Sequence, residues 1–328
     1  MPHPITKLTF LGCGGITRRH SRSLRRFRGR VRCFYASRDP ANAAALNERY
    51  DGAGYFDSYA AALSDDEVDA VLVATPPSSH LELTLAALDH GKHVIVEKPA
   101  FLRAADIDLV RSAEVKSGRR VLVAENYCYK PLVRTLREIV QSGALGEIRF
   151  IELNAVKYQA PSGWRANPVL AGGGALFEGG VHWIDLLANL GLRIEAVHGF
   201  RPGDWGTHER SMLVVAEFEQ GALGTLTHSW EIPSPLRGIR FSHIYGTRAS
   251  VSFESNGLFL LVSGARPRLV FPGLRDINGY QAMFDDLLGS LQTGSQPMMS
   301  LDRAQRDLEL IESAYRHVVA HPELETIS

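Results

Sequence analysis

The sequence predicts an α/β domain with a doubly wound parallel sheet, followed by an α+β domain with a large, mostly antiparallel sheet. A chain of 328 residues exceeds the length at which one hydrophobic core keeps growing, so two domains are expected. Short apolar runs alternate with longer helical patterns as far as residue 125, whereas later segments alternate with period two. These patterns assign residues 1–125 to the first domain and 126–328 to the second; whether the last helices pack back on the first domain stays open.

The first domain contains runs rich in Val, Ile and Leu, separated by helical patterns. This order is typical of a parallel sheet that is covered by helices on both faces. The expected strands are Ile5–Leu11, Val31–Ala36, a short one near Tyr55, Ala70–Ala74, His93–Val96 and Val121–Ala124. The expected helices are Gly15–Phe27, Pro40–Tyr50, Tyr59–Leu63, Ser79–His90 and Ala104–Ser117.

The pattern changes after Pro131. In the segment 212–218, every second residue is apolar, which is typical of a strand with one buried face. The expected strands are Ile148–Tyr158, Ala196–Arg201, Met212–Phe218, Leu223–Ile232, Ile239–Gly246, Ser250–Glu254 and Leu258–Val262. The expected helices are Leu132–Ser142, one that begins near Gly174, Tyr280–Leu291 and Leu301–Ala320.

Charge and cysteine content narrow the class of protein. Lys plus Arg and Asp plus Glu both total 36, so no global field attracts nucleic acid or an anionic membrane. One local basic cluster, Arg18 to Arg30, is either a solvated helix face or a phosphate contact near its N-terminal end. The three cysteines lack disulfide or metal-site spacing, and no segment resembles a signal peptide or a membrane span. A cytoplasmic location is expected.

The glycine-rich segment 12–17 follows the first strand and opens the first helix. Gly12 permits a tight turn, and Gly14 lets backbone N–H groups approach a pyrophosphate at the positive helix end. Thr17 departs from the usual pattern, which has Gly or Ala there. We expect cofactor contacts from this loop, at Gly12, Cys13, Gly14, Gly15 and Ile16, although a purely structural turn is the alternative.

The second expected strand ends in Ser37 and Arg38, where an NAD-binding domain normally has a carboxylate. A hydroxyl and a guanidinium suit the oxygens of a 2′-phosphate, so the sequence favours NADP over NAD. A simply solvated Arg38 is the alternative. Asp39 is expected to help start the next helix beside Pro40.

Two further strand ends lie at the carboxyl edge of the sheet. The segment 75–80 is rigid and polar, and Thr75, Pro76 and His80 are expected to wall the cofactor site. Alternatively the segment is only a cap and turn, with Ser78 or Ser79 capping the next helix. After the fifth strand, Glu97 and Lys98 are also assigned to the cofactor site.

Several motifs follow one another along the chain: the glycine-rich segment 12–16, Thr75-Pro76, Gly91-Lys92-His93-Val94, Glu97-Lys98-Pro99, and Gly172-Gly173-Gly174 with His182 and Asp185. Together they resemble the motifs of the Gfo/Idh/MocA oxidoreductases. The resemblance spans both domains in the right order. It implies an N-terminal Rossmann domain, a C-terminal open-faced sheet often used for oligomerisation, and an NAD(P) cofactor. It also implies a sugar or cyclitol substrate, a homo-oligomer formed through that sheet, and a cis Lys98–Pro99 bond.

Carried over by motif position, Lys98 lies beside the nicotinamide and hydrogen-bonds the oxygen that gains charge during hydride transfer. His182 is the general acid/base, and Asp185 orients His182 or contacts the substrate. Glu178 is assigned to substrate binding, but it departs from the aspartate that is more common in the family. The alternatives are an exposed strand-end lysine and a core histidine. A metal is excluded, since no cysteine or second histidine lies near.

Glu178, His182 and Asp185 have the spacing i, i+4 and i+7, which predicts one helix face. Four more residues are candidates for substrate binding. Tyr127 and Lys130 follow the sixth strand, with simple interface packing as the alternative. Trp164 and Arg165 precede the three glycines, with an exposed loop pair as the alternative.

The sequence therefore predicts an NAD(P)-dependent enzyme that moves hydride to or from a secondary alcohol or carbonyl of a sugar, cyclitol or related polyol. A non-catalytic nucleotide-binding sensor of the same fold is the main alternative. The presence of both Lys98 and His182 argues against it, because a sensor needs neither. A third possibility is carbon–oxygen cleavage through a transient oxidised intermediate with tightly held NAD.

Overall fold

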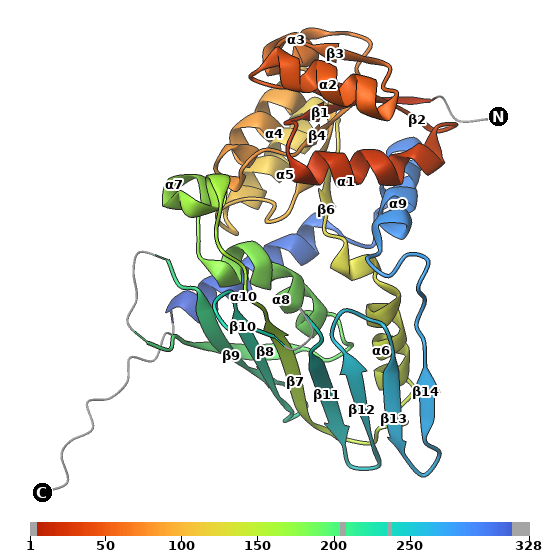
Figure 1. The fold of residues 1–328 in the computed structure, drawn as a ribbon, viewed down its shortest axis with the longest axis vertical. Helices are drawn as coiled ribbons and strands as arrows, with labels where there is room; N and C mark the ends of the chain where they lie inside the picture. The colour runs from red at the N-terminus through yellow and green to blue at the C-terminus, as the bar shows by residue number, and fades with distance from the viewer. Residues whose placement is uncertain (1–4, 204–207, 235–237, 317–328) are drawn as a thin grey trace, which may run out of the picture. The chain divides into compact units, whose positions relative to one another are not determined.

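The computed structural model describes residues 5–203, 208–234 and 238–316. The chain divides into two units, each made of two segments. Unit 1 comprises Met1–Asn126 and Tyr280–Gln305, and unit 2 comprises Tyr127–Gly279 and Arg306–Ser328. Each unit holds one sheet (Figure 1). In the described part of the chain, no helix combines the length and the apolar character that crossing a bilayer requires.

Unit 1 contains a six-stranded sheet with the order β3-β2-β1-β4-β5-β6, in which all neighbouring strands are parallel. The order reverses between β1 and β4, which is where doubly wound sheets bind ligands beyond the carboxyl ends of their strands. Each expected strand is confirmed to within one residue at either end. The strands are β1 (Thr6–Leu11), β2 (Val31–Ala36), β3 (Gly54–Phe56), β4 (Ala70–Val73), β5 (His93–Glu97) and β6 (Val121–Ala124).

The helices of unit 1 follow the expected order. The predicted first helix ends its α-helical part at Leu24 and continues as a short 3₁₀ turn, η1 (Arg25–Phe27). This first helix is α1 (Gly15–Leu24). The others are α2 (Pro40–Tyr50), α3 (Tyr59–Ser64), η2 (Pro77–Ser79), α4 (His80–Asp89), α5 (Asp106–Ser117) and α9 (Tyr280–Thr293). In Figure 1, α9 (blue) lies next to α1 (red), and the two helices are in contact.

Unit 2 contains an eight-stranded sheet with the order β14-β13-β12-β11-β7-β10-β9-β8. All neighbours are antiparallel except β10 and β7, so the prediction of a mostly antiparallel sheet is confirmed. The strands are β7 (Ile148–Val156), β8 (Ile194–Phe200), β9 (Ser211–Phe218), β10 (Leu223–Ser229), β11 (Phe241–Gly246), β12 (Ala249–Glu254), β13 (Leu260–Gly264) and β14 (Arg268–Val270).

One face of this sheet is buried and the other is open. The apolar side chains of β9 that were expected to share a face are all buried, and α8 packs against β7 and β10. On the opposite face, strand register brings Phe150, Leu223 and Tyr245 side by side, and all three are exposed. This open face also carries the exposed side chains of Phe241, Leu261 and Leu269.

The helical segments of unit 2 carry most of its predicted site residues. They are η3 (Tyr127–Tyr129), α6 (Pro131–Gln141), η4 (Gly163–Ala166), α7 (Pro168–Ala171), η5 (Leu176–Gly180), α8 (Val181–Ala188) and the part of α10 (Leu301–Arg316) from Arg306 onward. Neither α7 nor β14 is predicted from the sequence, because four and three residues are too few to show a period. The predicted last helix continues to Ala320, beyond the described residues.

Candidate active site

The glycine loop of unit 1 has the shape that a dinucleotide needs. Gly12 has φ +110°, and a Cβ there would lie 2.6 Å from the Ala74 carbonyl oxygen, so only glycine fits. A Cβ on Gly14 or Gly15 would meet nothing within 4 Å, so space remains for a ligand. Thr17 is fully buried and donates through Oγ1 to the Gly12 carbonyl at 2.7 Å, which explains why threonine is accommodated here.

The N-terminus of α1 is available to an anion. Its cap residue is Gly14, which has no side chain to bond the first N–H groups, and the first turn carries no acidic residue. Unsatisfied N–H groups and the positive end of the helix dipole together favour a pyrophosphate. The loop and helix therefore fit a dinucleotide cofactor.

The three residues that follow β2, Ser37, Arg38 and Asp39, make different contacts. Asp39 caps α2 by accepting from the Ala41 N–H at 3.0 Å, as the sequence predicts. Ser37 accepts from the Asp39 N–H at 3.3 Å. Arg38 is exposed, close enough to Tyr59 that its charge offsets part of the rise in the Tyr59 pKa that burial causes. A hydroxyl and a guanidinium thus lie together just after β2.

Cys13 belongs to the same corner of the loop. Burial raises the pKa of its thiol to about 11, against the opposing effects of a hydrogen bond with Ser37 and the charge of Arg18. The thiol is therefore neutral at physiological pH, and its Sγ faces the Ala36 carbonyl at 3.6 Å. It contributes shape to the loop rather than charge.

His80 links the two strand ends that the sequence assigns to the cofactor site. Its Nε2 lies 2.9 Å from the Thr75 carbonyl, and its Nδ1 lies 3.0 Å from the Pro99 carbonyl. The ring is buried, and burial lowers its pKa. Because both ring nitrogens face carbonyl oxygens of unit 1, His80 positions these segments. Ser79 does not cap α4; its hydroxyl donates back to Thr75 Oγ1 at 2.8 Å.

Glu97 ends β5 and Lys98 follows it directly, half-buried, with a cis bond to Pro99 as the family resemblance implies. The Glu97 carboxylate is buried, and its partners are not apparent from the sequence. Its Oε2 accepts from the Lys98 N–H at 3.1 Å, and its Oε1 bonds His20 Nε2. Burial raises the pKa of Glu97, but the charge and hydrogen bond of His20 and the charge of Lys98 outweigh it, so the pKa is lowered.

His20 is the residue of unit 1 that sequence reasoning missed. It was grouped with the basic cluster 18–30, yet its side chain is fully buried. The pattern that could have revealed it is the spacing of Thr17, His20, Ser21 and Leu24, the buried stripe of α1. The arginines around it, such as Arg18 and Arg22, are exposed.

In unit 2, three predicted residues form one stack. The Tyr127 ring lies parallel to the His182 ring, with centroids 4.4 Å apart and an interplanar angle of 12°. Lys130 Nζ lies 4.3 Å from the centre of the Tyr127 ring, and Lys130 is buried. Trp183, which the sequence analysis did not single out, meets the edge of Tyr127 at 5.6 Å. His182 is half-buried, so its ring is held by aromatic packing while part of it stays accessible.

Three other predicted residues form a second group. Arg165 donates to Glu178 Oε1 from both Nε at 3.1 Å and Nη2 at 2.9 Å, and its guanidinium lies 4.3 Å from the centre of the Trp164 ring. Glu178 is buried, whereas Arg165 and Trp164 are half-exposed. The carboxylate of Glu178 therefore ties the loop that carries Trp164 and Arg165 to η5.

The helix that carries Glu178 begins with a π-turn rather than a regular α-helix. The i, i+4, i+7 rule holds only for a regular α-helix, and a π-turn changes the rotation per residue. The contacts of the three residues differ accordingly. Glu178 faces Arg165 and His182 faces Tyr127, while the fully buried Asp185 accepts through Oδ1 from Asn189 Nδ2 at 2.6 Å. The role of Asp185 toward His182 stays a prediction.

The glycines before and inside this helix make room for buried side chains. A Cβ on Gly174 would lie 1.7 Å from Glu209 Oε2, and Glu209 Oε1 accepts from the Leu176 N–H and from Tyr315 Oη, both at 2.8 Å. Burial raises the pKa of Glu209, which these hydrogen bonds partly offset. A Cβ on Gly179 would lie 3.1 Å from Trp230 Nε1. Close packing thus places the start of the helix.

His228 of β10 was assigned only to a strand, but it lies near both groups. The charges of Lys157, Glu178, Arg240 and His182 all influence it. Burial lowers the pKa of His228 to about 3, so the ring stays neutral at physiological pH. His228 thus lies close enough to Glu178 and His182 for the charges of both to act on its ring.

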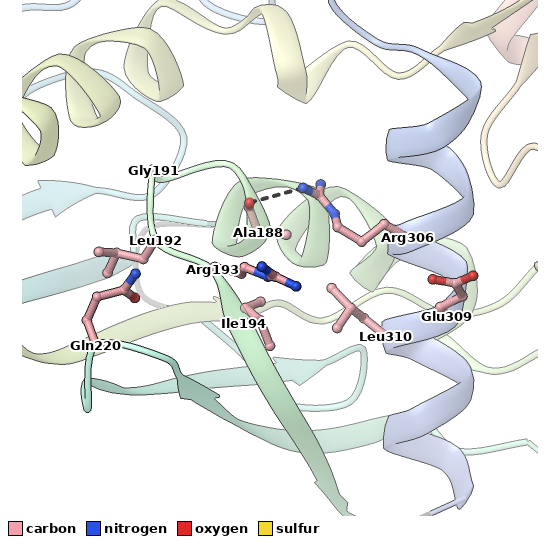
Figure 2. Close-up of a pocket in the computed structure, with 9 residues that line it drawn as sticks. All are labelled: Ala188, Gly191, Leu192, Arg193, Ile194, Gln220, Arg306, Glu309 and Leu310. Carbon is pink, nitrogen blue, oxygen red and sulfur yellow. Dashed lines mark hydrogen bonds between the residues drawn. The ribbon is translucent and has the colours of Figure 1, made fainter.

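A separate pocket of about 650 Å³ opens in unit 2 between the end of α8, the start of β8 and α10 (Figure 2). Its two arginines already have acidic partners: Arg193 pairs with Glu219 at 3.0 Å, and Arg306 pairs with Asp307 at 2.8 Å. Arg306 also donates to the Ala188 carbonyl at 3.2 Å. None of the predicted site residues lines this pocket.

Comparison with family models identifies the class of protein. Residues 6–125 match the model described as "Oxidoreductase family, NAD-binding Rossmann fold", and residues 133–252 match the Gfo/Idh/MocA C-terminal domain. The chain belongs to the Gfo/Idh/MocA family, so it is an NAD(P)-dependent oxidoreductase.

Individual relatives are more distant. D-glucoside 3-dehydrogenase of Escherichia coli is 25% identical over 81% of each chain. An NADP(+)-dependent D-xylose 1-dehydrogenase of Haloferax volcanii is 31% identical over 60% of this chain and 61% of its own. Among solved structures, an oxidoreductase from Thermotoga maritima has a TM-score of 0.85 at 26% identity, covering 96% of this chain and 97% of its own. A levoglucosan dehydrogenase bound to NADH and levoglucosan has a TM-score of 0.83 at 22% identity, covering 96% and 98%.

Proposed function

We propose that this protein is an NADP-preferring dehydrogenase or reductase that acts on a secondary alcohol or carbonyl of a sugar, cyclitol or related polyol. The observation that carries the proposal is the position of Lys98, which follows β5 at the carboxyl edge of the sheet, the same edge as the open glycine loop. The relatives named for D-glucoside and D-xylose oxidation support the substrate class.

The chain's own residues supply the polar chemistry. A bound nicotinamide accepts or donates the hydride at C4. The Lys98 ammonium donates a hydrogen bond to the reacting oxygen as negative charge develops there. The His182 imidazole takes the hydroxyl proton or returns it, and its stack on Tyr127 fixes the ring plane for that transfer. Asp185 orients His182 or contacts the substrate.

The preference for NADP rests on the corner after β2. Arg38 is exposed, and within the described part of the chain its side chain forms no ion pair or hydrogen bond. The neighbouring Asp39 is engaged as the cap of α2. A guanidinium next to the Ser37 hydroxyl matches the oxygens of a 2′-phosphate. The Asp39 carboxylate, which follows Arg38, already accepts from the Ala41 N–H at 3.0 Å and from Asn42 Nδ2 at 2.9 Å.

The substrate residues are assigned from unit 2. The half-exposed Trp164 ring offers an apolar face on which a sugar ring can stack, and Arg165 can reach a hydroxyl or acid group. Tyr127 and Lys130 line the His182 side, and Glu178 acts by holding Arg165. The contacts within unit 2 support these proposed roles.

The open face of the unit 2 sheet supports a homo-oligomer. Its exposed row of Phe150, Leu223 and Tyr245 is the type of apolar surface that a second copy would cover. A cytoplasmic location is also part of the proposal, because all three cysteines are free thiols.

The proposal is tested by absorbance at 340 nm with NADP or NAD and a panel of sugars, cyclitols and polyols. Thermal shift with each cofactor is measured in parallel, because a ligand that binds only the folded state raises stability by mass action. Turnover of at least one polyol with NADP supports the proposal. Cofactor binding without turnover of any panel member, together with capture of a protein partner, would favour the sensor instead. Cofactor that survives gel filtration would favour carbon–oxygen cleavage.

A further inference from the structure

A buried hydrogen-bonded pair in unit 1 has no role in the chemistry described above. His20 Nε2 of α1 bonds Glu97 Oε1 at the end of β5, and the two residues are 0% and 5% exposed. Burying two ionisable groups is costly unless each finds a partner. A hydrophobic pair would pack in the same place without this cost, so the position of the pair calls for a functional explanation.

The pair joins the cofactor loop to the lysine. His20 lies on α1, the helix that the glycine loop opens, and Glu97 is the residue before Lys98. The second oxygen of the same carboxylate accepts from the Lys98 N–H at 3.1 Å. One carboxylate therefore holds both the helix and the backbone of Lys98.

Both partners are themselves held in place. The His20 ring makes T-shaped contacts with Tyr280 and Phe284 of α9, with centroids 5.6 Å and 5.0 Å away. On the other side of Lys98, His80 Nδ1 lies 3.0 Å from the Pro99 carbonyl and 3.1 Å from the Ala100 carbonyl. The backbone on both sides of Lys98 is thus tied by side chains from two helices.

We propose that His20 and Glu97 form a positioning pair that sets the direction in which the Lys98 ammonium points. The pair also fixes Lys98 relative to the glycine loop, because His20 lies on the helix that this loop opens. The proposal rests on the proposed role of Lys98 in hydride transfer. His20 is fully buried, so it acts through Glu97 and the backbone of Lys98. The cofactor and the oxygen-stabilising group are then placed by one rigid connection.

The contact between His20 Nε2 and Glu97 allows an experiment in which one substitution removes the hydrogen bond and another restores it. His20 bonds through Nε2, and the amide nitrogen of glutamine reaches about the same position, whereas that of asparagine ends near Nδ1. We expect His20→Asn to lower kcat on the order of 10-fold with less than about a 2-fold change in either KM, because a small misplacement acts on the transition state. His20→Gln should restore most of kcat. Equal kcat in both variants would overturn the proposal.

Glu114 provides a matched control for Glu97. Glu114 Oε1 accepts from the Val121 N–H at 2.6 Å. Like Glu97, Glu114 therefore bonds the backbone at the end of a strand, but this is the amino end of β6, away from Lys98. Glu97→Gln should lower kcat, whereas Glu114→Gln should lower thermal stability with kcat unchanged. If both variants lose stability and neither loses kcat, the pair is only structural and the proposal is wrong.

A second readout does not depend on turnover. The chain has six lysines, Lys7, Lys92, Lys98, Lys116, Lys130 and Lys157, so ¹³C reductive methylation gives few resonances. The Lys98 resonance is assigned by its loss in Lys98→Arg. It should shift in His20→Asn but not in His20→Gln or Glu114→Gln. An unchanged Lys98 resonance in His20→Asn overturns the proposal. If no polyol is turned over, the proposed function fails, but the resonance still shows whether the pair positions Lys98.

Discussion

Lys98 in unit 1 and His182 in unit 2 are held by different kinds of contact. Lys98 follows directly from a strand of a parallel sheet, and hydrogen bonds to its neighbouring backbone fix where it leaves the sheet. His182 lies on a helix that begins with a π-turn, and aromatic packing on Tyr127 holds its ring. Backbone hydrogen bonds thus position Lys98, whereas packing between side chains positions His182.

Replacing Lys98 tests the backbone-held half. Lys98→Met should lower kcat by on the order of 10² or more, because the reacting oxygen loses its charged donor. Affinity for NADP, measured by thermal shift, should stay close to that of the wild type. Lys116→Met, at an exposed position on α5, is the control and should behave like the wild type. A Lys98→Met enzyme with normal turnover would refute the assigned role.

Replacing His182 tests the side-chain-held half. His182→Asn should lower kcat by about 10² and remove one limb of the pH–rate profile, because the proton acceptor is lost. Tyr127→Phe keeps the stacking ring and should cost much less than Tyr127→Ala. His198→Asn, at a partly exposed position on β8, serves as the control. A pH–rate profile that is the same in His182→Asn and the wild type contradicts the assignment.

Gly14 and Gly174 are expected to have different roles, the first in cofactor binding and the second in packing of the fold. Gly174→Ala places a Cβ 1.7 Å from Glu209 Oε2, so it should lower the free energy of unfolding by on the order of 1–3 kcal/mol. Gly14→Ala meets no atom within 4 Å and should leave that free energy nearly unchanged while weakening NADP binding. Chemical denaturation and cofactor titration measure the two effects. Similar unfolding curves for both variants would contradict this distinction.

Acid should destabilise the two units over different pH ranges. His228 has a folded-state pKa of about 3 against an ordinary value of 6.5, so the unfolded chain binds more protons between these values. Its contribution is complete above pH 6.5 and is lost as the pH falls, by on the order of 1–2 kcal/mol at pH 5. The pKa of Glu97 is lowered from 4.5, so its contribution is present above that pH and is lost only as the pH falls further.

Urea unfolding at pH 7 and pH 5 checks this order. His228→Leu should lose less stability than the wild type between these two pH values, whatever its stability at pH 7. Glu97→Gln should show the wild-type change over the same interval, because its ionisation lies lower. An unaltered pH dependence in His228→Leu would show that the ring does not stay neutral in the folded state.

The smallest expected effect concerns the cofactor preference. Arg38→Gln should reduce the ratio of kcat/KM for NADP to that for NAD about 10-fold, because a phosphate contact is lost and no carboxylate is gained. Arg22→Gln, at an exposed position on α1, is the control. An unchanged ratio would show that Arg38 does not read the 2′-phosphate.

Local patterns in the sequence were enough to predict much of unit 1. Strand ends, the glycine loop and the cap at Asp39 depend on residues close in the chain, so periodicity and turn chemistry reveal them. The Lys98 motif likewise lies within a few residues of its strand. In unit 2, the sequence indicated the strands and the candidates Tyr127, Arg165 and Glu178, but not which of them meet.

The sequence by itself determined the fold class, the order of the strands along the chain and the residue types at the candidate site. Only the tertiary structure decided their partners: His20 turned out to face Glu97 instead of solvent, Glu178 holds Arg165, and His182 stacks on Tyr127. The physical reason is distance along the chain. His20 and Glu97 are separated by 77 residues, and no local period records which buried polar groups will satisfy one another once the core closes.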